Sequence, residues 1–262
     1  MDPHRGLLSV AARHVQGVAA VIEETSGDYT AEDLANRAEL LRSIRGDGLE
    51  IGAFHSPIPV GEDARVTYVD LLPPEIQQRY FPEVPEDVPV VTPDLVLPAD
   101  DLHSIAEGAL DFVLASHLLE HIANPVGALV EWHRVLRTGG FLYLVLPDMR
   151  HTFDRDRVRT TLDHLVLDAQ QDRAHPDRLA RDAEHYREWA GIVNSLDDPG
   201  QRDFWAGHLV KIQYPIHFHC WQPEDIRDLF HEIDKIGMAH FRICGEAVMK
   251  GGYEFVFLLQ KV

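Results

Sequence analysis

Two histidines alternate in the run Tyr214–Trp221. If this run is extended, His217 and His219 point the same way, because side chains two residues apart lie on one face of a strand. An imidazole titrates near neutral pH and can take a proton from a reacting group. We therefore predict His217 and His219 as general-base candidates. The alternative is that both histidines only hydrogen-bond backbone carbonyls.

Two further candidates for chemistry follow short apolar runs. Asp148 comes directly after Phe141–Leu146, and His121 comes after Phe112–Ala115. Asp148 is placed to face a substrate. His121 opens a helix, and for this residue a purely structural role is as good an interpretation as a catalytic one. We predict both as catalytic candidates.

A divalent metal is a related hypothesis. Carboxylates and imidazoles are its common ligands, and a candidate set is Asp148, His151, Asp154, His217 and His219. Because sixteen histidines are scattered along the chain, such clusters arise easily by chance. The metal is therefore not favoured, and no residue is assigned as a ligand.

The elements that would position these groups form a strand–helix–strand unit. Phe112–Ala115 is a short apolar run typical of a buried parallel strand. A helix follows with Asn124 as N-cap and Pro125 in its first turn, and Gly139 and Gly140 are predicted to end it. Phe141–Leu146 is the next strand. A ligand is then expected at residues 116–121 and 147–150, where the parallel strands end.

The run from Asp111 to Asp148 resembles the strand-four to strand-five segment of class I S-adenosylmethionine-dependent methyltransferases, of the methyltransferase type 11-like, glycan- and natural-product-associated branch. Upstream, Leu49–Gly52 resembles the first motif of that family, and Val66–Asp70 resembles its second strand, which ends in an acidic residue. The resemblance implies an α/β, Rossmann-like class I methyltransferase sheet with N-terminal helices and a helical lid insertion after strand five.

The same resemblance implies S-adenosylmethionine as cofactor. A turn at Gly52 would let its methionine end approach the backbone, and Asp70 would bind the ribose hydroxyls. The family's glycine-rich loop is reduced here to Gly52, and Pro98 stands where an acidic residue is expected. Asp100 or Asp101 could instead bind the adenine, or form a charged turn in water. The implied cofactor-binding residues are Glu50, Gly52, Ala53, Phe54, Asp70, Leu71, Asp100, Asp101, Ser116 and His117.

Three regions are predicted along the chain: an N-terminal helical cover (1–48), a core (49–148 and 216–262) and a helical substrate lid (149–215). The lid is expected to hold helices near Leu162–Ala169, Leu179–Val193 and Phe204–Ile212, with a turn at Asp197–Gly200. After it, a helix opens at Pro223. An antiparallel pair, Phe241–Cys244 and Tyr253–Leu259, is expected to close the sheet.

Charge and composition limit the classes of binding partner that the sequence predicts. The 262 residues carry a formal charge of −19, so nucleic acid and anionic membranes are poor partners. The two cysteines, Cys220 and Cys244, suit neither a zinc ribbon nor a disulfide framework and are expected to be free thiols. The N-terminus lacks the apolar core of a signal peptide, and a soluble, cytoplasmic protein is expected. The sequence leaves open whether the chain forms a homo-oligomer.

The resulting hypothesis is methyl transfer from S-adenosylmethionine to a small polar acceptor. The favoured acceptor is a hydroxyl of a sugar or natural product, which makes an O-methyltransferase, although nothing in the spacing separates O- from N- or C-methylation. Two alternatives remain: a methyltransferase-like binding protein without methyl-transfer activity, and a fold relative that catalyses a non-methyl reaction.

Overall fold

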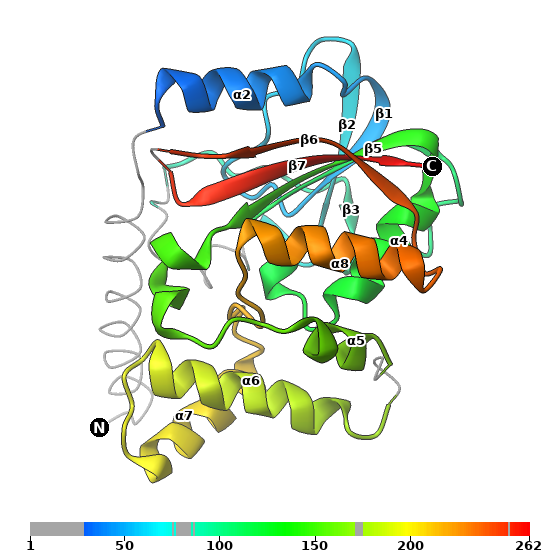
Figure 1. Ribbon diagram of the computed structural model, residues 1–262. Coiled ribbons are helices and arrows are strands. Elements are labelled where there is room, and N and C mark those ends of the chain that lie inside the picture. The colour runs from blue at the N-terminus through cyan, green and yellow to red at the C-terminus, as the bar shows by residue number, and fades with distance from the viewer. Residues whose placement is uncertain (1–28, 75, 77–84, 86, 171–174, 251) are drawn as a thin grey trace.

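The computed structural model describes residues 29–74, 76, 85, 87–170, 175–250 and 252–262. Its centre is a seven-stranded sheet in the order β3-β2-β1-β4-β5-β7-β6 (Figure 1). The strands are β1 (Gly46–Ile51), β2 (Ala64–Asp70), β3 (Leu95–Val96), β4 (Leu110–Ser116), β5 (Leu136–Pro147), β6 (Phe241–Val248) and β7 (Glu254–Lys261). β1 to β5 pair in parallel, and β7 runs antiparallel between β5 and β6. The predicted α/β sheet and its antiparallel final pair are confirmed.

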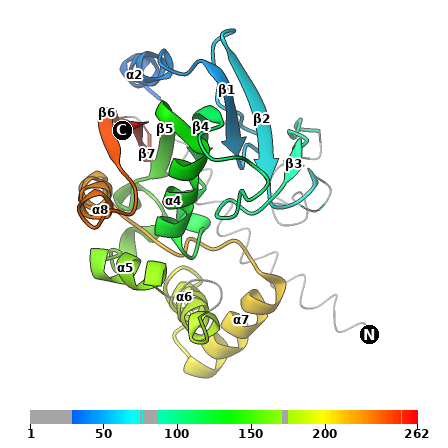
Figure 2. The same ribbon diagram turned by 90° about the vertical axis from the view of Figure 1, so that its right-hand side faces the viewer.

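Helices cover both faces of this sheet. Helix α2 (Ala31–Leu41) lies over one face, and α4 (Pro125–Val135) and α8 (Pro223–Lys235) lie over the other (Figure 2). In β4, Phe112 and Leu114 join the apolar cluster on the α2 side, whereas Val113 and Ala115 join the cluster with α4 and α8. The continuous apolar run of β4 follows from this two-sided burial.

The helix after β4 begins as predicted. The Asn124 side chain accepts a hydrogen bond from the Gly127 amide, and Pro125 occupies the first turn. The predicted end at Gly139 and Gly140 is wrong, because α4 stops at Val135 and Leu136 is already paired with Leu110 of β4. The glycines form an irregular part of β5, where a Cβ on Gly140 would lie only 2.9 Å from the Arg137 carbonyl oxygen.

Only the last part of the predicted N-terminal cover is described. Thr30 and Asp33 form the expected capping box of α2, with each side chain accepting a hydrogen bond from the other residue's amide. Residues 1–28 of the predicted cover lie outside the described residues.

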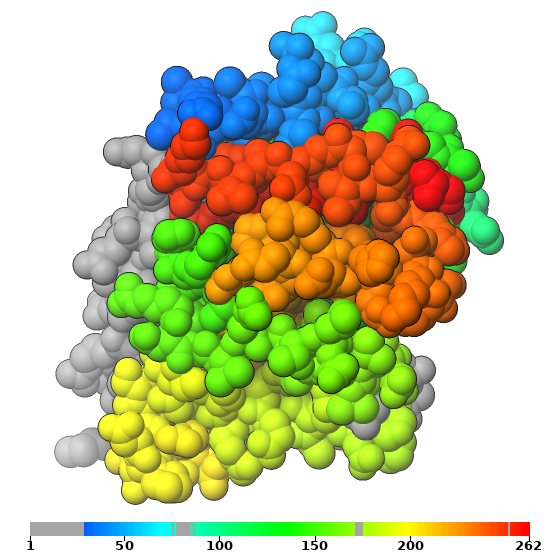
Figure 3. All heavy atoms as spheres, in the orientation of Figure 1, coloured from blue at the N-terminus to red at the C-terminus, as the bar shows by residue number. Residues whose placement is uncertain are grey.

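The segment after β5 contains the three predicted helices. They are α5 (Leu162–Gln170), α6 (Arg178–Ile192) and α7 (Pro199–Ile212), preceded by the short 3-10 helices η2 (Met149–His151) and η3 (Phe153–Asp156). The predicted turn at Asp197–Gly200 is partly wrong. Asp198 caps α7 by accepting from the Gln201 amide, so Pro199 and Gly200 form the first helical turn. In Figure 3, α6 and α7 form one end of the molecule, and α5 lies between them and α8.

Three smaller features complete the description of the fold. Cys220 is buried, Cys244 is exposed, and both are free thiols, as expected. Trp221 is a core residue with 1% of its surface exposed. Within the described ranges, no helix combines the length and apolar character needed to cross a bilayer.

Candidate active site

The carboxyl ends of the parallel strands meet at one edge of the sheet. Gly52 follows β1, Asp70 ends β2, Ser116 ends β4 and Asp148 follows β5. The strand order reverses between β1 and β4, the place where open α/β sheets bind ligands. The predicted residues at the ends of these four strands therefore share one edge.

The loop after β1 turns sharply at Gly52. Gly52 has φ +74°, and its amide donates to the Val69 carbonyl at 2.9 Å. A Cβ here would lie 3.2 Å from a Leu118 methyl, so the site favours glycine through both backbone angle and space. Ala53 is buried, and Phe54 also has a positive φ, +42°, with its ring 4.9 Å from that of His55. One glycine therefore suffices for this turn.

Glu50 holds the returning part of that loop. Its Oε1 accepts a hydrogen bond from the Ile58 amide at 2.8 Å, and the residue is only 1% exposed. Oε2 is buried without a hydrogen-bond partner among the described residues. Burial raises the pKa of Glu50 from 4.5 to about 7, although the bond from Ile58 opposes this.

This raised pKa predicts a pH-dependent stability. The contribution of neutral Glu50 to the free energy of unfolding is fully present below pH 4.5 and is lost as the pH rises through about 7. The total loss is about 3 kcal/mol. Glu50→Gln keeps the acceptor for Ile58 and cannot ionise. We expect it to unfold at higher urea concentration than the parent at pH 8 and at the same concentration at pH 4.

The exposed Glu62→Gln is the matched control for that comparison. Urea titrations of cofactor-free protein at both pH values measure the difference. Equal stability of Glu50→Gln and the parent at pH 8 would contradict the expected cost of ionising Glu50.

The residues predicted to bind the ribose and the adenine of the cofactor lie at the end of β2 and after β3. Asp70 Oδ1 accepts from the Leu72 amide at 3.4 Å, while Leu71 is 59% exposed. Asp100 is part of a turn after β3, and Asp101 is exposed with its Oδ1 3.0 Å from His103 Nδ1. The adenine roles of Asp100 and Asp101 stay predictions.

His117, beyond Ser116, is fixed between two carboxylates. Its φ is +49°, its Nε2 lies 2.7 Å from Glu254 Oε2, and its Nδ1 lies 3.6 Å from Glu120. Burial acts to lower the pKa of His117, but Glu254 and Glu120 outweigh it and the pKa is raised. Arg37 of α2 also binds Glu254, at 2.6 Å. His117 is therefore oriented by α2, β7 and η1 (Leu119–His121) together.

His217 is paired with a buried carboxylate. Its Nδ1 lies 2.6 Å from Asp154 Oδ2, and Asp154 Oδ1 accepts from Arg157 Nη1 at 2.8 Å. Burial acts to raise the pKa of Asp154, but His217 and Arg157 outweigh it and the pKa is lowered. An ionised Asp154 accepts a hydrogen bond from Nδ1, so Nε2 is the His217 nitrogen that can take up a proton from another group.

His121 lies against this pair. The two imidazole rings of His121 and His217 are 4.6 Å apart, and His121 Nδ1 donates to the Ile216 carbonyl at 2.9 Å. Burial, followed by the charge of His217, lowers the pKa of His121 to about 3, so it is neutral. Glu120 is fully buried beside it, and burial raises its pKa. His217, His121 and Glu120 offer polar atoms within 4.8 Å of one another.

His219 does not share this site, so the expectation that His217 and His219 point the same way is wrong. The chain bends at Phe218, because the amides of Phe218 and His219 both donate to the Glu120 carbonyl, at 2.7 and 3.3 Å. His219 is fully buried among His164, His185 and Asp168 instead. Burial lowers the pKa of His219 well below its usual value.

Asp148 is engaged locally. It is 1% exposed and accepts from the Arg150 amide at 3.0 Å and from Arg150 Nε at 2.9 Å. His151 is exposed. Among the described residues, neither Asp148 nor His151 belongs to a group whose atoms could share a metal ion, so the metal set considered from sequence is not brought together.

Several site residues were not predicted from sequence. Glu254 is the first residue of β7, directly before the apolar run of that strand, and is only 3% exposed. A lone carboxylate beside such a run is the signal that could have identified it. His164 and Asp168 are four residues apart on α5, so they share one helix face, and this spacing was the available signal for them.

Comparison with known proteins agrees with this fold. Residues 46–144 match the family model described as a methyltransferase domain, methyltransferase type 11. That segment contains β1 to β4, α4 and most of β5. Within these residues the chain is therefore similar to a methyltransferase domain, and the matched segment includes the strand ends Gly52, Asp70 and Ser116 described above.

Individual relatives are distant. The chain is 30% identical over 105 residues to an uncharacterized 37.1 kDa protein in a transposon of Streptomyces fradiae, covering 39% of this chain and 28% of that protein. A Thermotoga maritima structure, described as a possible histamine N-methyltransferase, is 14% identical, with a TM-score of 0.44 over 86% of this chain and 89% of that one. An Aquifex aeolicus SAM-dependent methyltransferase is 11% identical, with a TM-score of 0.43 over 93% and 97%.

Proposed function

We propose that the protein transfers a methyl group from S-adenosylmethionine to a small polar acceptor, with a hydroxyl of a sugar or natural product as the favoured acceptor group. The observation that carries the proposal is the Asp154–His217 pair, next to the segment that follows β4 in a class I methyltransferase fold. A buried carboxylate bonded to one imidazole nitrogen fixes the other as a base.

The residues at the strand ends fit the cofactor. Gly52 provides a turn in which a Cβ would meet Leu118, and the buried Glu50 Oε2 lacks a hydrogen-bond partner among the described residues. Gly52 and Asp70 would hold the methionine and ribose parts, and Ser116 and His117 would border the bound molecule. When bound, S-adenosylmethionine supplies an electrophilic methyl group on a sulfonium.

His217 would complete the transfer by accepting the acceptor's proton. The acceptor oxygen would gain the methyl carbon as the carbon–sulfur bond of the sulfonium breaks and S-adenosylhomocysteine leaves. The hydroxyl proton would move to His217 Nε2, and Asp154 would stabilise the resulting imidazolium. The bonds from Arg157 and His217 keep Asp154 ionised for that role. His121 borders the base as a neutral ring.

The helices α5 to α7 would form the acceptor side. They follow β5 in sequence, and the η3 segment that leads into them carries Asp154. Aromatic rings lie around His217, with Phe153 at 4.6 Å and Trp189 of α6 at 5.9 Å between ring centroids. Such rings suit the apolar face of a sugar or natural product and exclude water from the base.

Asp70→Ala tests the cofactor half of this proposal. Losing two hydrogen bonds from ribose hydroxyls to a carboxylate should cost about 1.5 to 3 kcal/mol, or roughly 10- to 150-fold in the Kd for S-adenosylhomocysteine. Isothermal titration of both proteins measures this. Asp63→Ala, at the opposite edge of the sheet just before β2, is the matched control and should bind as the parent does.

Unchanged affinity in Asp70→Ala would remove Asp70 from the cofactor site. Binding of S-adenosylhomocysteine without any methylated product would favour the non-methylating alternative. The observation that favours that alternative is the loop after β1, which has one glycine where the family pattern has several.

A further inference from the structure

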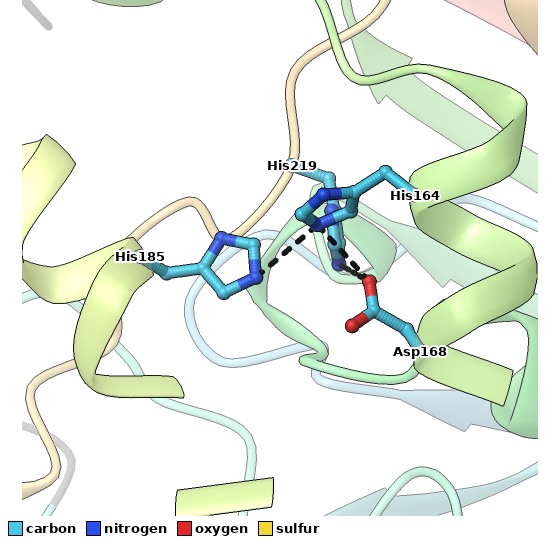
Figure 4. A group of neighbouring side chains, drawn as sticks. All are labelled: His164, Asp168, His185 and His219. Atoms are coloured by element: carbon cyan, nitrogen blue, oxygen red, sulfur yellow. Dashed lines mark hydrogen bonds and ion pairs between the residues drawn. The ribbon is translucent and has the colours of Figure 1, made fainter. Parts of the chain in front are cut away.

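Three histidines and one aspartate converge where the helical segment meets the core. His164 and Asp168 come from α5, His185 comes from α6, and His219 comes from the stretch between α7 and α8. Figure 4 shows the three rings and the carboxylate directed toward a common centre. Each residue offers one ligand atom, and all four atoms lie within 4.8 Å of one another.

The separations match those between ligands of one small metal ion. His164 Nε2 lies 3.3 Å from His185 Nε2 and 3.2 Å from Asp168 Oδ2, and His219 Nε2 lies 3.7 Å from the same oxygen. Four ligands at 2.0–2.1 Å from a tetrahedral zinc ion are about 3.3 Å apart. The atoms are thus close to their places for such an ion before it is added.

Burial gives a second, independent observation. Asp168 and His219 are fully buried, and His185 is 8% exposed. Asp168 Oδ1 accepts from Arg181 Nε at 3.0 Å and Nη2 at 2.6 Å, which fixes the carboxylate. Its other oxygen, Oδ2, is buried and directed at the histidines, and among the described residues none of its contacts, including the one with His164 at 3.2 Å, meets hydrogen-bond geometry. A buried carboxylate oxygen in this state needs a cation or a donor.

We propose that His164, Asp168, His185 and His219 bind one zinc ion. Three imidazoles with one carboxylate suit zinc, whereas magnesium and calcium prefer sites made of oxygen ligands. Arg181 orients the carboxylate from outside the ligand set, as outer partners of metal ligands do. Four protein ligands leave no open position, so the zinc is structural.

The zinc would join three chain segments that are far apart in sequence. Two ligands on α5, one on α6 and one before α8 would lock the helical segment onto the core. The same stretch carries His217 two residues before His219, so the zinc would also restrain the proposed base. This role does not depend on the proposed methyl transfer.

Metal content of the purified full chain is the first test. We expect inductively coupled plasma mass spectrometry to find about one zinc ion per chain. After chelation and dialysis, titration with zinc chloride should give one site, and cobalt chloride should give the visible absorption bands of tetrahedral cobalt. Removing zinc should lower Tm by roughly 5 to 10 °C. A parent protein that neither contains zinc nor binds it in one-to-one amount would overturn the proposal.

Two ligand variants locate the ion. His185→Ala and His164→Ala should each lose stoichiometric zinc and the cobalt bands, while the exposed His231→Ala on α8 should keep both. Far-UV circular dichroism checks that each variant is folded. If His185→Ala does not fold, His164→Ala still reports on the site, because the His164 side chain is 36% exposed and its loss disturbs the core less.

His121→Ala distinguishes this site from the other described group, Glu120, His121 and His217. Zinc retained in His121→Ala but lost in His185→Ala supports the proposal. The reverse result would assign the ion to the proposed active site and overturn it. Because metal content and Tm are read without any acceptor, failure here leaves the methyl-transfer proposal unaffected.

Discussion

We expect His217→Gln to lower kcat for the proposed methyl transfer by about 10²- to 10⁴-fold and to leave the affinity for S-adenosylhomocysteine unchanged. Glutamine fills a similar space but cannot take the acceptor's proton, and a positioned base contributes about this factor. His217 is paired with Asp154 and surrounded by His121, Phe153 and Trp189, so no bulk water replaces it readily. Turnover is followed as S-adenosylhomocysteine release with acceptors found among hydroxylated sugars and natural products.

Two further variants sharpen this prediction. Asp154→Asn should lower kcat less than His217→Gln and should shift the pH profile of kcat, because it acts through the orientation and basicity of His217. His231→Gln, on the exposed side of α8, should behave as the parent. Full turnover in His217→Gln would show that another group, or water, takes the proton.

We expect Arg157→Ala to lower the free energy of unfolding by about 3 to 5 kcal/mol, the usual effect of removing one partner from a buried ion pair. The Arg157 side chain is 2% exposed and binds Asp154 at 2.8 Å and Glu188 of α6 at 2.6 Å. It also donates to the carbonyl of His217 at 2.9 Å. One guanidinium thus ties η3, α6 and the His217 segment together, and its loss leaves Asp154 buried without that cation.

Urea denaturation of Arg157→Ala and Arg187→Ala measures the difference. Arg187 also joins two helices, by binding Asp203 at 2.8 Å, but its side chain is 49% exposed. An exposed ion pair contributes about 0 to 1 kcal/mol. Similar losses in the two variants would mean that Arg157 acts as an ordinary surface residue and does not anchor the base.

Several elements could be predicted because their signals are local. The apolar run of β4, the Asn124 cap with Pro125, and the Thr30–Asp33 capping box each depend on residues a few positions apart. The helix after β4 was extended too far because Leu136 suits a helix as well as a strand. Its pairing with Leu110, a distant residue, decided the matter.

The sequence by itself determined the strand and helix order of the core, the turn at Gly52 and the position of Asp70 at the end of β2, since hydrophobic period and end signals act within one element. Only the tertiary structure decided which side chains meet. The bend at Phe218 sends His217 to Asp154 and His219 to His164, Asp168 and His185. The direction of each ring is set by hydrogen bonds to the Glu120 carbonyl and by burial against helices that are distant in sequence. The alternation of side chains holds only within a regular strand, so it could not predict these directions.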